Sequence, residues 1–140
     1  MVNASDHQLS ESGFKVVKPE AEIMTKQKLP NFVGISGATA GATAISMSMA
    51  IIPPVGKGEP HIHEGHETAL YILKGRVKFR YGPNLQFEKQ VEEGDFVFIA
   101  ADVPHQPINM SDTEPVYIIV ARNDPDEQES VRPYVPNGTA

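Results

Sequence analysis

A chain of 140 residues has the size of one ordinary domain, and its 40% hydrophobic and 21% charged residues are typical of a soluble globular protein. The lack of cysteine excludes disulfides, thiolate metal sites and cysteine nucleophiles, so any metal must be held by imidazole and oxygen. The formal net charge of −6 argues against nucleic acid as a partner, no apolar run is long enough to span a membrane, and no secretory signal opens the sequence, so we expect a cytoplasmic protein.

Taken in chain order, short runs rich in Val, Ile, Phe and Tyr are separated by turns, for which twelve prolines and eleven glycines supply the signals. This pattern predicts an all-β sandwich or barrel. Strands are expected at residues 14–18, 43–52, 94–100 and 115–123, and two more within 69–82, hinged at Lys74-Gly75. The polar tail contains one candidate helix, residues 125–130, and is otherwise expected to be extended.

The strand predicted at residues 43–52 alternates two kinds of side chain. Ile45, Met47, Met49 and Ile51 alternate with alanine and serine, which is the two-residue period of a strand. Methionines at this spacing are interpreted as core rather than as a soft metal site.

Three of the five histidines fall within six positions, at His61, His63 and His66. Successive side chains of a strand point to opposite faces, so His61 and His63 share one face and lie close enough to bind one ion. Neutral imidazole is a common ligand of zinc, copper, iron and nickel. Of the other two histidines, His105 follows a strand and is the candidate for a further ligand, whereas His7 lies in the N-terminal segment.

Strand alternation carried forward from the His pair predicts which later side chains face the core. Residues of the same parity are Glu67, Ala69, Tyr71, Leu73 and, beyond the hinge, Val77, Phe79 and Tyr81. The opposite parity holds the basic residues Arg76, Lys78 and Arg80, which belong in water. The count therefore favours Glu67 as an inward ligand, while a bulge at Gly65 would present His66 instead.

Two segments together resemble the cupin superfamily. The first, "GKGEPHIHEGHETALYILKG", matches the first cupin motif, in which His-x-His is followed by Glu and then Gly; the second, "GDFVFIAADVPHQPIN", matches the second motif from Gly94 through His105 to Asn109. The sequence departs from the second motif at Ala100, where Pro is usual, and at Asp102, where Gly is usual.

The resemblance implies an antiparallel jelly-roll barrel, the double-stranded β-helix, as a single domain. Its core would cover about residues 30–124, with 1–13 and 125–140 peripheral. It also implies one divalent metal ion per chain, Fe, Mn, Ni, Cu or Zn, held by His61, His63, Glu67 and His105, with His66 as the alternative to Glu67. Because imidazole must be neutral to coordinate, metal affinity is expected to fall below about pH 6.

Cupins include enzymes and binding proteins, so the resemblance leaves the function open. The first hypothesis is a metal-dependent enzyme acting on a small organic molecule, of dioxygenase, isomerase or lyase type. Inward Tyr71, Phe79 and Phe98 would then shape an apolar pocket, with Tyr71 a candidate proton donor. The alternatives are a non-catalytic protein that binds metal and a small ligand, and a barrel that the metal only stiffens.

A homodimer is expected as well, because a small jelly roll has sheet edges that need to be paired or covered. The candidate edge strands are residues 14–18 and the segment "NFVGISGATA" at 31–40. The resemblance supports a dimer too, since cupins commonly pair. No membrane partner is expected.

Overall fold

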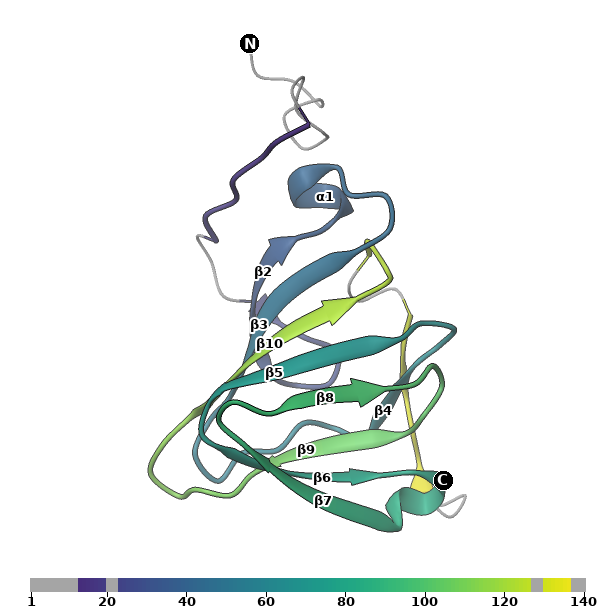
Figure 1. Ribbon diagram of the computed structural model, residues 1–140. Coiled ribbons are helices and arrows are strands. Elements are labelled where there is room, and N and C mark those ends of the chain that lie inside the picture. Colours follow the sequence, from purple (N-terminus) through teal and green to yellow (C-terminus); the bar gives the residue numbers. More distant parts are fainter. Residues whose placement is uncertain (1–12, 20–22, 127–129, 137–140) are drawn as a thin grey trace.

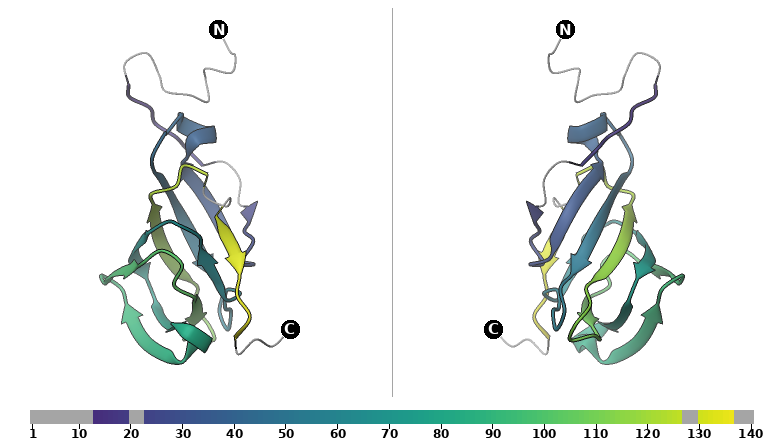
Figure 2. Two further views of the ribbon diagram at one scale, coloured as in Figure 1. Left: turned by 90° about the vertical axis from the view of Figure 1, so that its right-hand side faces the viewer. Right: turned by 90° about the vertical axis from the view of Figure 1, so that its left-hand side faces the viewer.

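The computed structural model describes residues 13–19, 23–126 and 130–136. Its strands form two antiparallel sheets that face each other (Figures 1 and 2). The strands are β1 (Ile23–Met24), β2 (Pro30–Ile35), β3 (Ser46–Ile52), β4 (His61–His63), β5 (Thr68–Lys74), β6 (Arg76–Tyr81), β7 (Phe87–Glu92), β8 (Phe96–Ile99), β9 (His105–Asn109), β10 (Val116–Arg122) and β11 (Val131–Pro133). One sheet has the order β1-β2-β3-β10-β5-β8 and the other β11-β4-β9-β6-β7.

The core lies between the sheets and consists of their inward side chains. It contains Leu29, Ile52, Leu70, Ile72, Val77, Phe79, Val116, Ile118 and Val120. In β10, every second residue from Val116 to Arg122 is buried, which is the period expected of a strand with one face toward the core. The all-β, jelly-roll architecture predicted from the sequence is confirmed.

The chain passes from one sheet to the other at the predicted hinge. β5 ends at Lys74 in the six-stranded sheet, and β6 begins at Arg76 in the five-stranded sheet. Gly75 has φ +99°, and a Cβ atom there would lie 2.8 Å from Val116 Cγ2, so this turn requires glycine.

Several strand predictions need correction. Residues 14–18 form no strand, and β2 lies between β1 and β3 rather than at an edge, so the edges of its sheet are β1 and β8. The polar strand β7 and the strand β9 were not predicted. The helix expected at 125–130 is absent from its described residues 125, 126 and 130, and its other residues lie outside the described part.

The face of β3 was interpreted in the wrong direction. Ser46 and Ser48 are buried, at 4% and 8% exposure, whereas Met47 is 47% exposed. The serines of this strand therefore face the core, and its methionine side is turned outward. Phe98, expected in the interior, is 64% exposed.

Two short elements complete the fold. The segment "SGATAG" forms a single helical turn, α1 (Gly37–Ala40), capped by the Ser36 hydroxyl at its start and by Gly41 at φ +74° at its end. A 3-10 turn, η2 (Pro83–Leu85), links β6 to β7. Among the described residues, no helix has the length and apolar character needed to cross a membrane.

Part of the C-terminal tail is built into a sheet. β11 pairs with β4 in antiparallel register, Val131 opposite His63 and Pro133 opposite His61. The strand order places β11 and β7 at opposite edges, and Figure 2 shows them on opposite sides of the molecule. The tail, expected at the periphery, therefore supports the strand that carries two of the histidines.

Candidate metal centre

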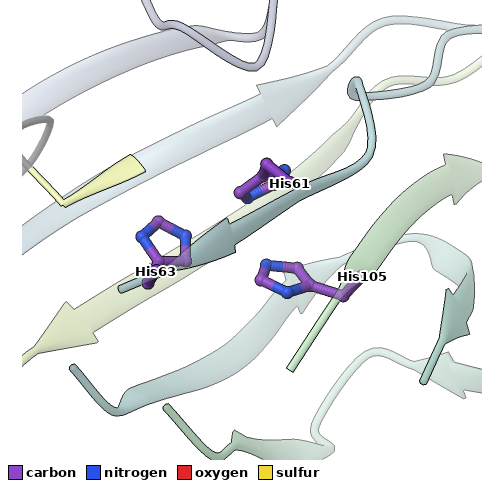
Figure 3. Close-up of side chains that lie close together, drawn as sticks. All are labelled: His61, His63 and His105. Atoms are coloured by element: carbon purple, nitrogen blue, oxygen red, sulfur yellow. The ribbon is translucent and has the colours of Figure 1, made fainter. Parts of the chain in front are cut away.

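Three histidines from two adjacent strands converge between the sheets (Figure 3). His61 and His63 come from β4 and His105 from β9, where His61 and His105 are register partners. Each is buried, at 2–5% exposure, and one ligand atom from each lies within 4.8 Å of the others. Metal–imidazole bonds of about 2.1 Å place ligands of one ion roughly 3–4 Å apart, so small side-chain rotations suffice to close the set.

Backbone carbonyls orient two of the three rings. The Nδ1 atom of His61 lies 2.7 Å from the carbonyl of Glu59, and that of His105 lies 2.9 Å from the carbonyl of Val103. A carbonyl can only accept, so in each ring Nδ1 carries the proton and Nε2 keeps its lone pair for a metal. This is the outer hydrogen bond that metal-binding histidines usually make.

The third ring, His63, has both nitrogens buried and without a hydrogen-bond partner among the described residues. Leaving buried polar atoms unsatisfied costs about 1–3 kcal/mol each. A metal ion bound through one of these nitrogens would offset part of that cost. The donor set, three imidazoles and no thiolate, thus fits a first-row divalent transition metal.

Burial keeps all three rings neutral near pH 7. Desolvation lowers the pKa of His61 from 6.5 to about 4, against the raising effect of its bond to Glu59, and lowers the pKa of His105 to about 3. The pKa of His63 falls furthest, first through burial and then through the positive charge of Arg122 and the neighbouring histidines. Neutral imidazole is the form that coordinates metal.

Arg122 and Thr68 lie beside the histidines, and neither was predicted from the sequence as a residue of the site. Arg122 is buried, at 8% exposure, and its Nε donates to Thr68 Oγ1 at 2.9 Å. Both residues line the small cavity that the three histidines border. The sequence does contain a pattern that indicates the position of Arg122. It continues the inward alternation of Val116, Ile118 and Val120, so its charged side chain is expected on the core side of β10.

Glu67 and His66 lie outside this group. Glu67 is exposed, and its backbone N–H donates to Asn123 Oδ1 at 2.8 Å. The Nδ1 atom of His66 lies 2.8 Å from the carbonyl of Glu64 and 3.6 Å from Asp124 Oδ2. The parity count was wrong because the turn at Gly65, φ +72°, shifts the alternation by one, so Thr68 takes the inward position expected of Glu67.

The same shift moves Tyr71 to the outside of its sheet. Leu70 and Ile72 are buried, whereas Tyr71 is half-buried and its ring packs on Phe96 at 4.8 Å between centroids. The alternation resets at Gly75, so Val77 and Phe79 are inward as expected. His7 lies outside the described residues.

The two departures from the second motif have structural explanations. Asp102 adopts φ +65°, a conformation that Asp tolerates better than most residues and that glycine adopts freely. Its carboxylate accepts from Gly65 N–H at 3.0 Å, and its own N–H donates to the His63 carbonyl at 3.2 Å. Asp102 therefore ties the turn after His63 to the loop before His105, while Ala100 is exposed.

Asn109, the last residue of that motif, has a structural role. Its Nδ2 lies within 3.0 Å of the carbonyls of Ile52, Pro53 and Glu114, and its Oδ1 accepts from Ser111 N–H at 2.8 Å. The side chain thereby ties the end of β3 to the loop between β9 and β10.

Two spaces adjoin the histidines and share part of their lining. The cavity beside the histidines has a volume of about 40 Å³, and a wider pocket of about 360 Å³ shares Phe79, Ile99 and His105 with it. The pocket is lined by Phe79, Tyr81, Lys89, Val91, Val97, Phe98, Ile99, Ala100, Val103 and His105. Among the described residues that line either space, none is Asp or Glu.

Comparison with solved structures gives the same fold. The chain superposes on an oxalate decarboxylase from Lactobacillus farciminis in complex with formate, with TM-score 0.65 and 21% identity, over 84% of this chain and 33% of that one. A Klebsiella pneumoniae protein with a double-stranded β-helix domain gives TM-score 0.63 and 12% identity, over 86% and 91%. An oxalate decarboxylase variant from Bacillus subtilis gives TM-score 0.64 and 16% identity, over 76% and 28%.

The chain thus spans about a third of the oxalate decarboxylases it matches, and at these identities the likeness is one of fold. No curated protein sequence matches it. The sequence model of the cupin domain matches residues 48–122, more than half of the chain and the part that contains all three buried histidines. The chain belongs to the cupin family.

Proposed function

We propose that this protein is a metal-dependent enzyme acting on a small organic acid. The observation that carries the proposal is the buried, neutral set of His61, His63 and His105, of which His105 also lines a pocket large enough for a small molecule. Their ligand atoms would hold one divalent ion of the group Fe, Mn, Ni, Cu and Zn. When bound, such an ion supplies Lewis acidity toward an oxygen of the substrate or, if it is iron, a site for dioxygen.

The charges around the site favour an anionic ligand. Arg122 is buried beside the histidines, so this residue and a divalent ion would both bring positive charge to the cavity. A carboxylate group entering the 40 Å³ cavity would lie close to both positive charges and be attracted by them. The Thr68 hydroxyl, held by Arg122, faces the same space and can bond to a second oxygen of the ligand.

The wider pocket suits the remainder of such a molecule. Val91, Val97 and Ile99 make most of it apolar, and Lys89 contributes one cationic group. Lys89 is the register partner of inward Phe79, so its side chain lies on the pocket side of β7. An acid with an apolar body fits this lining. That two of the fold's structural relatives are oxalate decarboxylases, one with formate, supports small carboxylates as a ligand class.

A non-catalytic protein that binds metal and a small acid is the second candidate. The observation that favours it is the outward position of Glu67 and Tyr71, the two residues expected to handle protons or complete the ligand set. With both residues outward, an enzyme at this site would have only the ion and water for proton transfer.

The first experiment measures metal. Protein purified without oxygen should contain about one equivalent of a first-row transition metal by elemental analysis, and His63→Ala should contain almost none. His66→Ala, a histidine three residues away, is the matched control and should keep full content. Full metal content in His63→Ala would contradict the proposed centre.

The second experiment separates enzyme from binding protein. The cobalt-substituted protein is titrated with acetate, oxalate and benzoate, and with ethanol and benzylamine as uncharged and cationic controls, while its visible absorption is recorded. Acids alone should change the spectrum. Product formation from a bound acid, followed by proton NMR in air and under argon, supports the enzyme; spectral change without turnover supports the binding protein.

A further inference from the structure

Gln27 borders the histidine cavity with a buried oxygen that has no hydrogen-bond partner among the described residues. The buried side-chain atoms without a partner in the described part of the chain belong to Gln27, Asn31, His63, Asp124 and Ser130. Of these residues, only Gln27 and His63 line the cavity. An unsatisfied buried polar atom destabilises a fold, so two residues with such atoms around one small space indicate that a bound group belongs there.

The turn that presents Gln27 is held by several hydrogen bonds. Residues 25–29 link β1 to β2. The N–H and the hydroxyl of Thr25 both donate to the Leu29 carbonyl at 3.0 Å, and the same hydroxyl accepts from Leu29 N–H at 3.1 Å. Thr25 and Leu29 are each only 4% exposed. The two ends of the turn are therefore fixed, and Gln27 lies at its centre.

Two hydrogen bonds connect this turn to the histidines. Glu59 N–H donates to the Gln27 carbonyl at 2.7 Å, and the Glu59 carbonyl lies 2.7 Å from His61 Nδ1. Glu59 thus orients the His61 ring and fixes the backbone of Gln27 beside it. A glutamine side chain has three rotatable bonds, so its oxygen can approach an ion held by the histidines while the backbone stays in place.

Gln27 and Thr68 are the two residues lining the cavity that have a side-chain oxygen, and their surroundings differ. Thr68 Oγ1 already accepts from Arg122 Nε at 2.9 Å, and the positive charge of Arg122 disfavours a cation at that oxygen. The Gln27 oxygen has both lone pairs available. The cavity, at about 40 Å³, has room for an ion or a water molecule. Of the two oxygens, that of Gln27 is therefore better suited to bind a cation.

We propose that the amide oxygen of Gln27 is the fourth protein ligand of the metal centre, in the role that the sequence analysis gave to Glu67. The inference rests on the metal centre of the proposed function and assigns its oxygen ligand to a residue outside both histidine segments. One ion would then satisfy the Gln27 oxygen and a His63 nitrogen together. Carbonyl oxygen suits Mn²⁺, whereas imidazole suits Zn²⁺, so Gln27 shifts the metal preference toward Mn²⁺.

Gln27→Met tests the assignment, because it keeps the length of the side chain and removes the oxygen. Metal-free protein is titrated near neutral pH with Mn²⁺, followed by the EPR signal of the free ion, and with Zn²⁺ in competition with a coloured chelator. The affinity for Mn²⁺ should fall about tenfold or more, and that for Zn²⁺ much less. The urea midpoint of the metal-free variant should equal or exceed that of wild type, since a buried unsatisfied atom is removed. Gln90→Met, the same exchange at an exposed position of β7, is the matched control and should leave both affinities unchanged.

Gln27→Glu keeps an oxygen at the same place and adds a negative charge, so it should bind Mn²⁺ more tightly than wild type. This variant decides the question if Gln27→Met does not fold. Equal Mn²⁺ affinities of wild type and both variants would overturn the assignment and leave the histidine centre standing, whereas a wild type that binds neither ion would overturn both. A lower urea midpoint in Gln27→Met with an equal fall for the two ions would show that Gln27 only supports the turn, which also overturns the assignment.

Discussion

The residues just before Gly65 and those just after it differ in their burial. On one side of Gly65, His61 and His63 are buried together, as their spacing predicts; on the other side, His66 and Glu67 are turned toward solvent. The period of a strand is a local property and is read correctly from a few residues. The phase between two strands depends on the turn that joins them, and here one left-handed glycine shifts it by one residue.

The largest effect should come from removing an inward histidine. His105→Ala and His61→Ala should lower metal content from about one equivalent to near zero, because each leaves two imidazoles. Elemental analysis after dialysis against a weak chelator measures this. Each variant must show a circular dichroism spectrum of folded β-sheet, so that metal loss is not a consequence of unfolding. Full metal content in His105→Ala would show that the histidines of the two motifs do not bind one ion together.

The next effect is on stability as pH falls. The unfolded histidines bind protons near pH 6.5, whereas in the fold the pKa of His61 is about 4 and that of His105 about 3. The unfolded state therefore binds more protons in this window, and the metal-free protein should lose about 1.4 kcal/mol of its free energy of unfolding per pH unit per histidine as pH decreases from about 6.5 to 4. Above pH 6.5 these groups should contribute no pH dependence.

The same pKa shifts lead to a second prediction, for the pH dependence of metal binding. Imidazoles of ordinary pKa would release metal below about pH 6, but burial moves direct proton competition in the folded protein toward pH 4. Urea unfolding at several pH values, with and without metal, separates the two effects. If the metal-free stability were flat between pH 6.5 and 4.5, the histidines could not be buried and neutral.

A smaller effect is expected from changes at Asp102, whose contact with Gly65 holds the turn between β4 and β5. Asp102→Gly keeps the backbone conformation accessible but removes the acceptor for Gly65 N–H, which should cost about 1 kcal/mol of stability and a few-fold in metal affinity. Asp102→Asn keeps both an acceptor and the tolerance for positive φ, so it should behave like wild type. Chemical denaturation and metal titration report the two quantities. Equal behaviour of the two variants would mean that the contact does not hold the turn.

The particular residues show what the sequence could establish. His61, His63 and His105 were found because two motifs with fixed spacing contain them, and the jelly roll followed from the same motifs and the run of short strands. Thr68, Tyr71 and Met47 were misplaced because their orientation depends on a turn or on the facing sheet. Arg122 was not predicted because a cation is not a metal ligand, and only its phase with the core positions of β10 marks it as inward.

The smallest effect should be that of Glu67→Gln on metal. Since Glu67 is exposed and its backbone contacts Asn123, removing its charge should leave metal content and affinity within about twofold of wild type. The informative comparison is Thr68→Glu, which places a carboxylate at the inward position that the motif resemblance assigned to Glu67. There the new group would face Arg122 and the three histidines, and it should tighten metal binding. Competition titration with a coloured chelator measures both variants. A tenfold loss in Glu67→Gln would show that the turn at Gly65 rearranges on metal binding and returns Glu67 to the interior, which would remove the difference between the two sides of the turn.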